Sequence, residues 1–183
     1  MENQIDVLNH FSEKSNPINK LAFKICAFLF AVNYLLSLIT FFYSLKVAKI
    51  DIESLLSYKL VLVQLFFVRV LPIIALVLYI VRKKAGWILL LVYSVNDLLS
   101  KSEFVINFVF NNKIISTVDP FLSVPILIMF VLSFAISFLL LSKSISKFLG
   151  INLLVKLVSL LASILIYFII KYYLVDLFIS LMK

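Results

Sequence analysis

Two residues of opposite charge lie at matching positions in strongly apolar surroundings. Arg69 and Asp97 each stand fourteen residues from Lys83, the centre of the basic turn Arg82, Lys83, Lys84. An apolar run lies on either side of this turn, so a helical hairpin would place both charges at a similar depth in a bilayer. Ionisable residues at that depth are costly and normally face a partner or a water-filled path. We expect an ion pair that fixes the packing of two helices; the alternatives are a role in moving an ion or proton, and no contact between the two residues.

Further polar residues follow Asp97 in the same apolar run. At 100° per residue, one narrow stripe of the expected helix collects Asn96, Ser100, Glu103 and Asn107. Asp97 and Lys101 flank this stripe at i, i+4 spacing. Such a stripe lines an aqueous cavity or is shielded by neighbouring helices, and we prefer the second interpretation.

The last apolar run carries a second polar stripe. On a helical wheel, about 120° covers Lys156, Ser159, Ser163, Tyr167 and Lys171. Lys171 is expected to extend its ammonium group toward the outer membrane interface. The serines are interpreted as small residues that let helices approach closely, because no base is arranged to activate them as nucleophiles.

The elements that position these residues must be membrane helices. In a chain of 183 residues, 64% are hydrophobic, only 14% are charged and the mean hydropathy is +1.17. A soluble core of this size cannot bury so much apolar surface, so the whole chain is expected to be one lipid-embedded domain. The net charge of +8 comes from lysines beside the apolar runs. Anionic lipid headgroups are therefore the expected partner of this charge, rather than nucleic acid.

The apolar runs predict an all-α integral membrane protein with a bundle of about five transmembrane helices. A polar segment, 1–20, precedes a transmembrane domain that occupies 21–183. The expected spans are 21–45, 60–81, 86–110, 121–142 and 153–182. Four spans result if the third, which its polar residues interrupt, re-enters on the side it came from. Residues 143–150 are predicted to form a short loop.

Positive charge near the ends of the spans predicts the orientation. With a cytoplasmic N-terminus and five crossings, the inner side collects Lys14, Lys20, Lys24, Arg82, Lys83, Lys84, Lys143, Lys147 and Lys156. The outer side keeps Lys46, Lys49, Lys59, Lys113 and Lys183. This excess favours a multi-pass protein of the cytoplasmic, or inner, membrane with its N-terminus inside. Trp87, beside the basic turn, is predicted to be an interfacial anchor.

The sequence contains few residues from which a catalytic or cofactor site can be built. It has one histidine, one cysteine and two glycines, and it lacks phosphate-binding and zinc-binding motifs. We therefore predict no catalytic residues, no cofactor and no metal, and we expect a protein that is not an enzyme. The candidate functional residues are the intramembrane ionisable ones: Arg69, Asp97, Lys101, Glu103 and Lys171.

Small size, short loops and polar stripes favour a protein that acts by binding another membrane protein. It would serve as an accessory subunit, or as an immunity factor against a membrane-active toxin. In general character the chain resembles the small inner-membrane immunity proteins that protect against pore-forming bacteriocins, and no residue roles are taken from that resemblance. The alternative is a transporter or channel component in which Arg69, Asp97, Lys101 and Glu103 line a path.

Overall fold

The protein is a bundle of helices. The computed structural model describes residues 17–47, 66–110, 120–169 and 171–172, and no strand occurs in these ranges. In chain order the elements are α2 (Pro17–Val47), the π-helical segment η1 (Phe66–Val70), α5 (Leu71–Ile80), α6 (Lys84–Phe110), α8 (Pro120–Leu141), α9 (Lys143–Leu149) and α10 (Leu153–Ile169).

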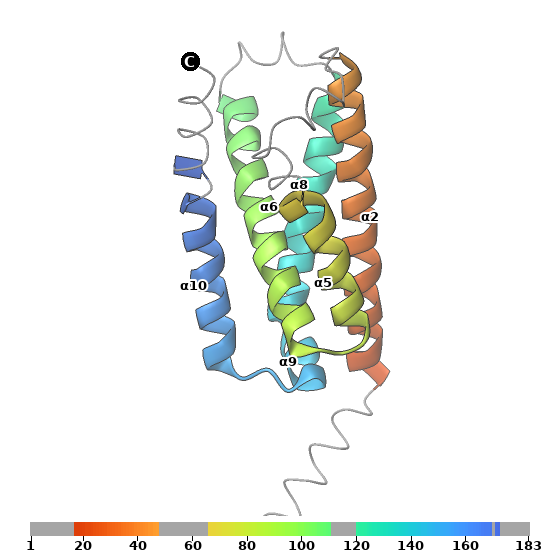
Figure 1. Ribbon diagram of the computed structural model, residues 1–183, viewed down its shortest axis with the longest axis vertical. Helices are drawn as coiled ribbons and strands as arrows, with labels where there is room; N and C mark the ends of the chain where they lie inside the picture. The colour runs from red at the N-terminus through yellow and green to blue at the C-terminus, as the bar shows by residue number, and fades with distance from the viewer. Residues whose placement is uncertain (1–16, 48–65, 111–119, 170, 173–183) are drawn as a thin grey trace, which may run out of the picture.

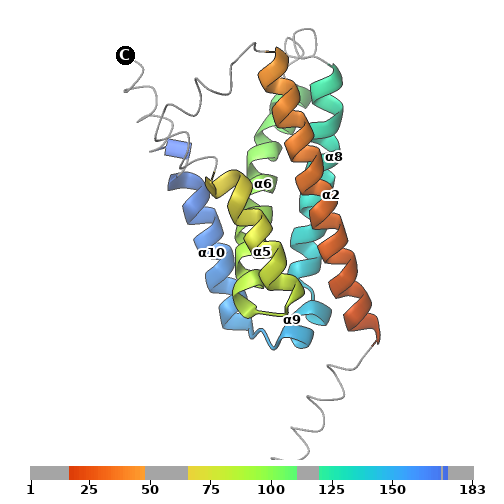
Figure 2. The same ribbon diagram turned by 45° about the vertical axis from the view of Figure 1, so that its right-hand side comes forward.

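Helix α6 occupies the middle of this arrangement. It packs against α5, α8 and α10, while α2 packs against α8, α9 and α5. The long helices run along one common axis in alternating directions, and α9 lies at the end where α2 begins and α5 meets α6 (Figures 1 and 2). We refer to this end as the α9 end. The central position of α6 explains how its polar residues meet several other helices.

The polarity of the bundle is inverted relative to that of a water-soluble protein. Large apolar side chains are exposed on the outward faces, including Leu35 (56%), Phe138 (69%) and Leu161 (67%). Small polar side chains are buried instead, among them Asn33, Ser94, Ser123, Ser133, Ser137, Ser159 and Ser163. An apolar exterior and small polar residues between helices are typical of bundles that pack within lipid.

Two helices of the described part are long and apolar enough to cross a membrane, Pro17–Val47 and Ser123–Leu141. The pair α9 and α10 adds a third candidate, which is bent by 110° and is therefore a broken span or a re-entrant segment. The apolar stretch Val68–Ile80 is shorter, and α6 has the length but carries polar and charged residues. An all-helical membrane protein is supported, and the number of five spans is not established.

Helix α6 continues without a break from Lys84 to Phe110. The sequence left open whether this run is interrupted near Asp97, and the described structure contains no such interruption. The predicted second span, by contrast, is described only from Phe66 onward, and the last run only to Ile169 and at 171–172. The remaining parts of those two predicted spans lie outside the described residues.

The turn between α5 and α6 depends on two residues. Arg82 has a positive φ of 60°, and its N–H donates to the carbonyl of Tyr79 while the N–H of Lys83 donates to Leu78. This pair of bonds is a Schellman motif, which satisfies carbonyls at the end of α5. Gly86 then lies against the backbone of α5, where an added Cβ would come within 2.2 Å of the Tyr79 nitrogen. Only glycine permits the two helices to come so close.

The prediction of a loop over 143–150 is wrong. Residues Lys143–Leu149 form α9, which begins at an N-cap bond from the Ile145 N–H to the Ser142 hydroxyl. It ends in a second Schellman motif, with Gly150 at φ 66° and the Ile151 N–H donating to Ser146. Serine at the N-cap and glycine just past the C-terminus are helix boundary signals, which the interpretation of 143–150 as a loop overlooked.

The interpretation of Trp87 as an interfacial anchor is also wrong. Its side chain is completely buried, and the indole N–H donates to the carbonyl of Leu140 at 2.9 Å. The last carbonyls of a helix have no partner within the helix, so Trp87 on α6 satisfies one of them on α8. Trp87 belongs to the same buried core as a group of aromatic residues in which Phe23 stacks on Tyr79 with centroids 4.3 Å apart and contacts Phe148 at 5.0 Å.

Candidate functional site inside the helix bundle

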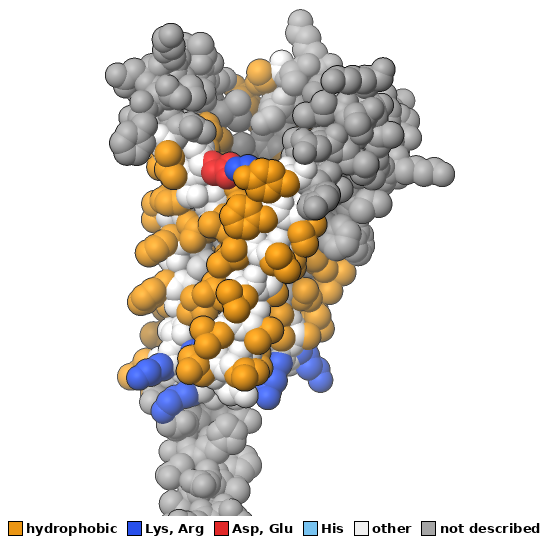
Figure 3. Space-filling view, turned by 90° about the vertical axis from the view of Figure 1, so that its left-hand side faces the viewer, with side chains coloured by type: hydrophobic (Ala, Val, Ile, Leu, Met, Phe, Trp, Pro, Cys, Tyr) orange, Lys and Arg blue, Asp and Glu red, His pale blue; other side chains and the backbone are white. Residues whose placement is uncertain are grey.

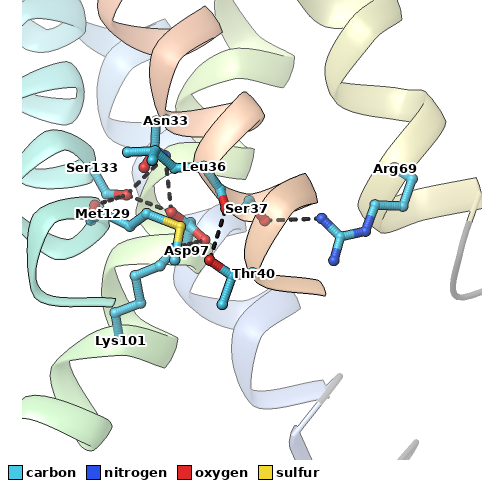
Figure 4. Close-up of polar contacts among 9 residues, drawn as sticks. All are labelled: Asn33, Leu36, Ser37, Thr40, Arg69, Asp97, Lys101, Met129 and Ser133. Carbon is cyan, nitrogen blue, oxygen red and sulfur yellow. Dashed lines mark hydrogen bonds and ion pairs between the residues drawn. The ribbon is translucent and has the colours of Figure 1, made fainter. Parts of the chain in front are cut away.

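A cluster of polar side chains surrounds Asp97 between α2, α6 and α8. The amide nitrogen of Asn33 donates to Asp97 Oδ2 at 3.1 Å and to the Ser133 hydroxyl at 3.2 Å. The Ser133 hydroxyl and the Lys101 ammonium also contact the Asp97 carboxylate. We name these four residues, Asn33, Asp97, Lys101 and Ser133, the Asp97 cluster (Figure 4).

The Asp97 cluster is well shielded from the surroundings. The side chains of Lys101 and Asp97 are only 11% and 15% exposed, and Asn33 and Ser133 are buried. At 1.5 Å per residue, Asp97 lies about 20 Å along α6 from its start at Lys84, well inside a bilayer about 30 Å thick. The carboxylate accepts from three donors, so its charge is balanced and its hydrogen bonds are largely satisfied.

The predicted ion pair between Arg69 and Asp97 is absent from the structure. Arg69 Nη1 donates to the Ser37 hydroxyl at 2.9 Å, and its guanidinium carbon lies 4.3 Å from the centroid of the Phe41 ring. Figure 4 shows Arg69 directed at Ser37 on α2, apart from Asp97. Lys101, one turn along the same helix, takes the place beside Asp97 because i, i+4 residues already face each other.

Helix α2 holds the segment that carries Arg69. The Tyr34 hydroxyl donates to the backbone carbonyl of Arg69 at 2.6 Å, so α2 contacts both the backbone and the side chain of this residue. The Arg69 Nε atom is buried and, among the residues that the structure describes, has no hydrogen-bond partner. Arg69 also lies in η1, and π-helical turns of this kind often occur at functional sites.

The second polar group joins α6 to α10. Asn96 donates from its amide to the carbonyl of Ser163 at 3.2 Å, and Glu103 accepts from Tyr167 and Lys171. We name these contacts the α6–α10 seam. The name also covers two further residues of the same stripe of α10, the buried Ser159 and Lys156. Unlike the Asp97 cluster, its charged end is half exposed: the side chain of Lys171 is 38% exposed and that of Glu103 44%.

The α6–α10 seam supports in part the interpretation that neighbouring helices shield the polar stripe of the third apolar run. Asn96 and Glu103 of the stripe on the third apolar run contact the stripe on the last one, where Ser163 is completely buried and Ser159 is 5% exposed, whereas Ser100 remains exposed. Lys171 pairs with Glu103, so its ammonium does not simply extend to the membrane interface. The Ser163 hydroxyl donates to the Ser159 carbonyl, which leaves these serines as small packing residues.

The structure thus divides the five predicted candidates into three settings. Asp97 and Lys101 come together, Glu103 and Lys171 come together, and Arg69 stands apart against α2. Sequence reasoning missed Asn33 and Ser37 altogether. A signal was present, because Asn33, Ser37, Thr40 and Ser44 follow one another at i, i+4, i+7 and i+11 and therefore share one face of α2.

Within the described ranges, no three His, Cys, Asp or Glu side chains gather as a metal would require. The arrangement offers a neutralised carboxylate and a separate guanidinium, which suit ion pairing and proton exchange. No protein family, curated protein or solved structure gives a match to this chain, so its function must be inferred from its own residues.

Proposed function

We propose that this protein is a small polytopic membrane protein that acts by binding another membrane protein. The observation that carries the proposal is the state of Arg69. Its guanidinium makes no ion-pair contact with a carboxylate of the described chain, since Asp97 is held by Lys101 and Glu103 by Lys171. A partner helix with an acidic residue at the same depth would supply the missing counter-charge.

The surroundings of Arg69 support access from a partner. The neighbouring side chains of Val68 and Val70 are 40% and 41% exposed. Ser37 accepts one hydrogen bond from the guanidinium and the Phe41 ring makes a cation–π contact with it. Asp97 attracts it electrostatically from beyond contact distance. A cation in hydrocarbon gains most from a carboxylate in direct contact, because the low dielectric strengthens the attraction.

The two forms of this proposal differ in the partner. An accessory subunit would bind a resident membrane complex, whereas an immunity factor would bind an intruding toxin. In either form we place the protein in the cytoplasmic membrane with its N-terminus inside, on the basis of the excess of lysine and arginine at the α9 end. The outer loops expected to reach a toxin, 46–59 and 111–119, lie almost wholly outside the described residues.

The test is co-purification of the tagged full-length protein from membranes of its own host in a mild detergent. A stoichiometric membrane partner should accompany the wild type and Arg69→Lys, be lost from Arg69→Gln, and carry Asp or Glu in a transmembrane segment. Arg82→Gln is the matched control, because it removes an equal charge at the α9 end. A partner that Arg69→Gln retains fully, or a wild type that purifies only with itself, would overturn the proposal.

A specific observation also favours a transport or channel component. Several buried polar atoms have no hydrogen-bond partner within the described chain: Asn33 Oδ1, Asn96 Oδ1, Arg69 Nε and Ser137 Oγ. Such atoms are costly in a dry interior, and water or a passing ion would satisfy them. Asp97→Asn should then abolish ion or proton flux in liposomes when flux is compared at equal amounts of folded protein. Unchanged flux would remove this alternative.

A further inference from the structure

The α9 end of the bundle carries a patch of uniformly positive charge. Among the described residues near this end there are no acidic side chains, and the basic ones are Lys20, Lys24, Arg82, Lys83, Lys84, Lys143, Lys147 and Lys156. Figure 3 shows lysine and arginine side chains gathered below the apolar surface at this end, with red and blue side chains together only near the other end. The structure therefore separates charge along the bundle axis.

Tertiary packing brings the two densest parts of this patch together. Arg82, from the α5–α6 turn, lies over the ring of Phe148 in α9, with its guanidinium carbon 4.9 Å from the ring centroid. Lys84 reaches the end of α9, where its ammonium group would lie 3.9 Å from a Cβ added at Gly150. The basic turn and α9 are thus adjacent, although about sixty residues of chain separate them.

Helix α9 is oriented to present its charges to a flat surface. It buries Ile145, Phe148 and Leu149 against the bundle, while Lys143 and Lys147 lie at i, i+4 on its exposed face. The bend of 110° between α9 and α10 turns α9 across the direction of the long helices. A short helix with apolar residues on one face and lysines on the other is of the kind that lies along a membrane surface, at the level of the headgroups.

We infer that the patch formed by the α5–α6 turn and α9 binds the headgroups of anionic phospholipids in preference to zwitterionic ones. Phosphate groups attract lysine and arginine electrostatically, and each basic residue close to an anionic membrane surface adds to the attraction. Hydrophobic surface ends at the patch, so the acyl chains of a bound lipid would lie along the exposed apolar faces of the neighbouring helices. This inference is independent of the proposed partner protein.

The test uses the purified full-length protein reconstituted in phosphatidylcholine bilayers that contain a trace of spin-labelled lipid. The fraction of label that is motionally restricted by the protein gives the association of phosphatidylglycerol relative to phosphatidylcholine. We expect a preference for phosphatidylglycerol of about three- to tenfold at low salt, which falls toward one in about 1 M salt. Absence of any preference at low salt would overturn the inference.

Matched variants localise the effect. Lys83→Gln with Lys143→Gln should at least halve the preference, because both side chains are exposed. Lys46→Gln with Lys49→Gln removes equal charge from the side that the sequence predicts to be outer, and should leave the preference intact. Unchanged fluorescence of the buried Trp87 shows that a variant is folded. An equal loss in both double variants, or tighter binding of soluble RNA than of phosphatidylglycerol micelles, would overturn the assignment to lipid.

Discussion

Asp97 and Lys101, one helical turn apart on α6, form an ion pair in the middle of the bundle. Their side chains are only 15% and 11% exposed. Asn33 from α2 and Ser133 from α8 add hydrogen bonds to the same carboxylate. The Asp97 side chain therefore links α6 to α2 and α8, and Lys101 neutralises the negative charge of its carboxylate. The pair is a structural centre of the bundle whatever the protein binds.

Removing one member of this pair should cost more than removing both charges. Lys101→Met leaves a buried carboxylate without its cation, which we expect to destabilise the folded protein by about 3 kcal/mol. The double variant Asp97→Asn, Lys101→Met should recover most of that loss, because the new amide keeps polar contacts with Asn33 and Ser133. Thermal unfolding in detergent, followed by the fluorescence of Trp87, measures the difference. A double variant no more stable than Lys101→Met would contradict the account.

The pair of Glu103 and Lys171 should respond differently because it is half exposed. Glu103→Lys places two cations together and should lower the thermal midpoint, and adding Lys171→Glu should restore it. About 1 M salt should reduce these differences, since exposed charges are screened by ions. The Asp97 and Lys101 variants serve as the control, because salt should change them little. An equal response to salt at both pairs would show that their difference in exposure has no energetic effect.

Gly86 should tolerate no side chain. In Gly86→Ala the new methyl group would overlap the backbone of Tyr79, so α5 and α6 must separate at the turn. We expect a loss of stability on the order of 3 kcal/mol, seen as a lower yield of monodisperse protein on size-exclusion chromatography. Ala85→Ser, a small change at the exposed neighbouring position, is the control. A wild-type yield for Gly86→Ala would mean that the turn opens at little cost.

Arg82 adopts a left-handed backbone conformation that disfavours β-branched residues. Arg82→Val should therefore be less stable than Arg82→Asn by about 1 kcal/mol, because asparagine enters this region more readily. Both variants lose the same charge and the same contact with Phe148, so their comparison isolates the backbone effect. Equal thermal midpoints for the two would argue against strain at this position.

The broad class of the fold was predictable because it depends on composition and on runs of apolar residues. The sequence also predicted that Asn96 and Glu103 share a face, and that Ser163, Tyr167 and Lys171 share another, since a helix of known period fixes which residues share a face. Asn96, Glu103, Tyr167 and Lys171 consequently met as the seam between those stripes. The sequence alone had not shown that the two stripes would face each other.

The partner of Asp97 was not predictable from matching depth alone. Arg69 and Asp97 lie at similar levels, but rotation of each helix about its axis decides which side chains meet, and Ser37 and Phe41 turned out to face Arg69. Trp87 was misjudged for a related reason: its position near a charged turn suggested the interface, whereas packing of α6 on α8 buried it. Such outcomes depend on contacts between elements, which periodicity within one element does not contain.

The inverted polarity of α10 has a consequence for assembly. Its outer face is apolar, and its inner face contacts α6 through hydrogen bonds. Most of its apolar surface is therefore already in contact with lipid before α10 packs against α6. Insertion of α10 and its docking on α6 are therefore separable steps, and the second resembles the association of two independent membrane helices. Water can compete for the hydrogen bonds of the half-exposed Glu103 but hardly for those of the buried Ser163. The contacts between α10 and α6 should therefore break first near Glu103.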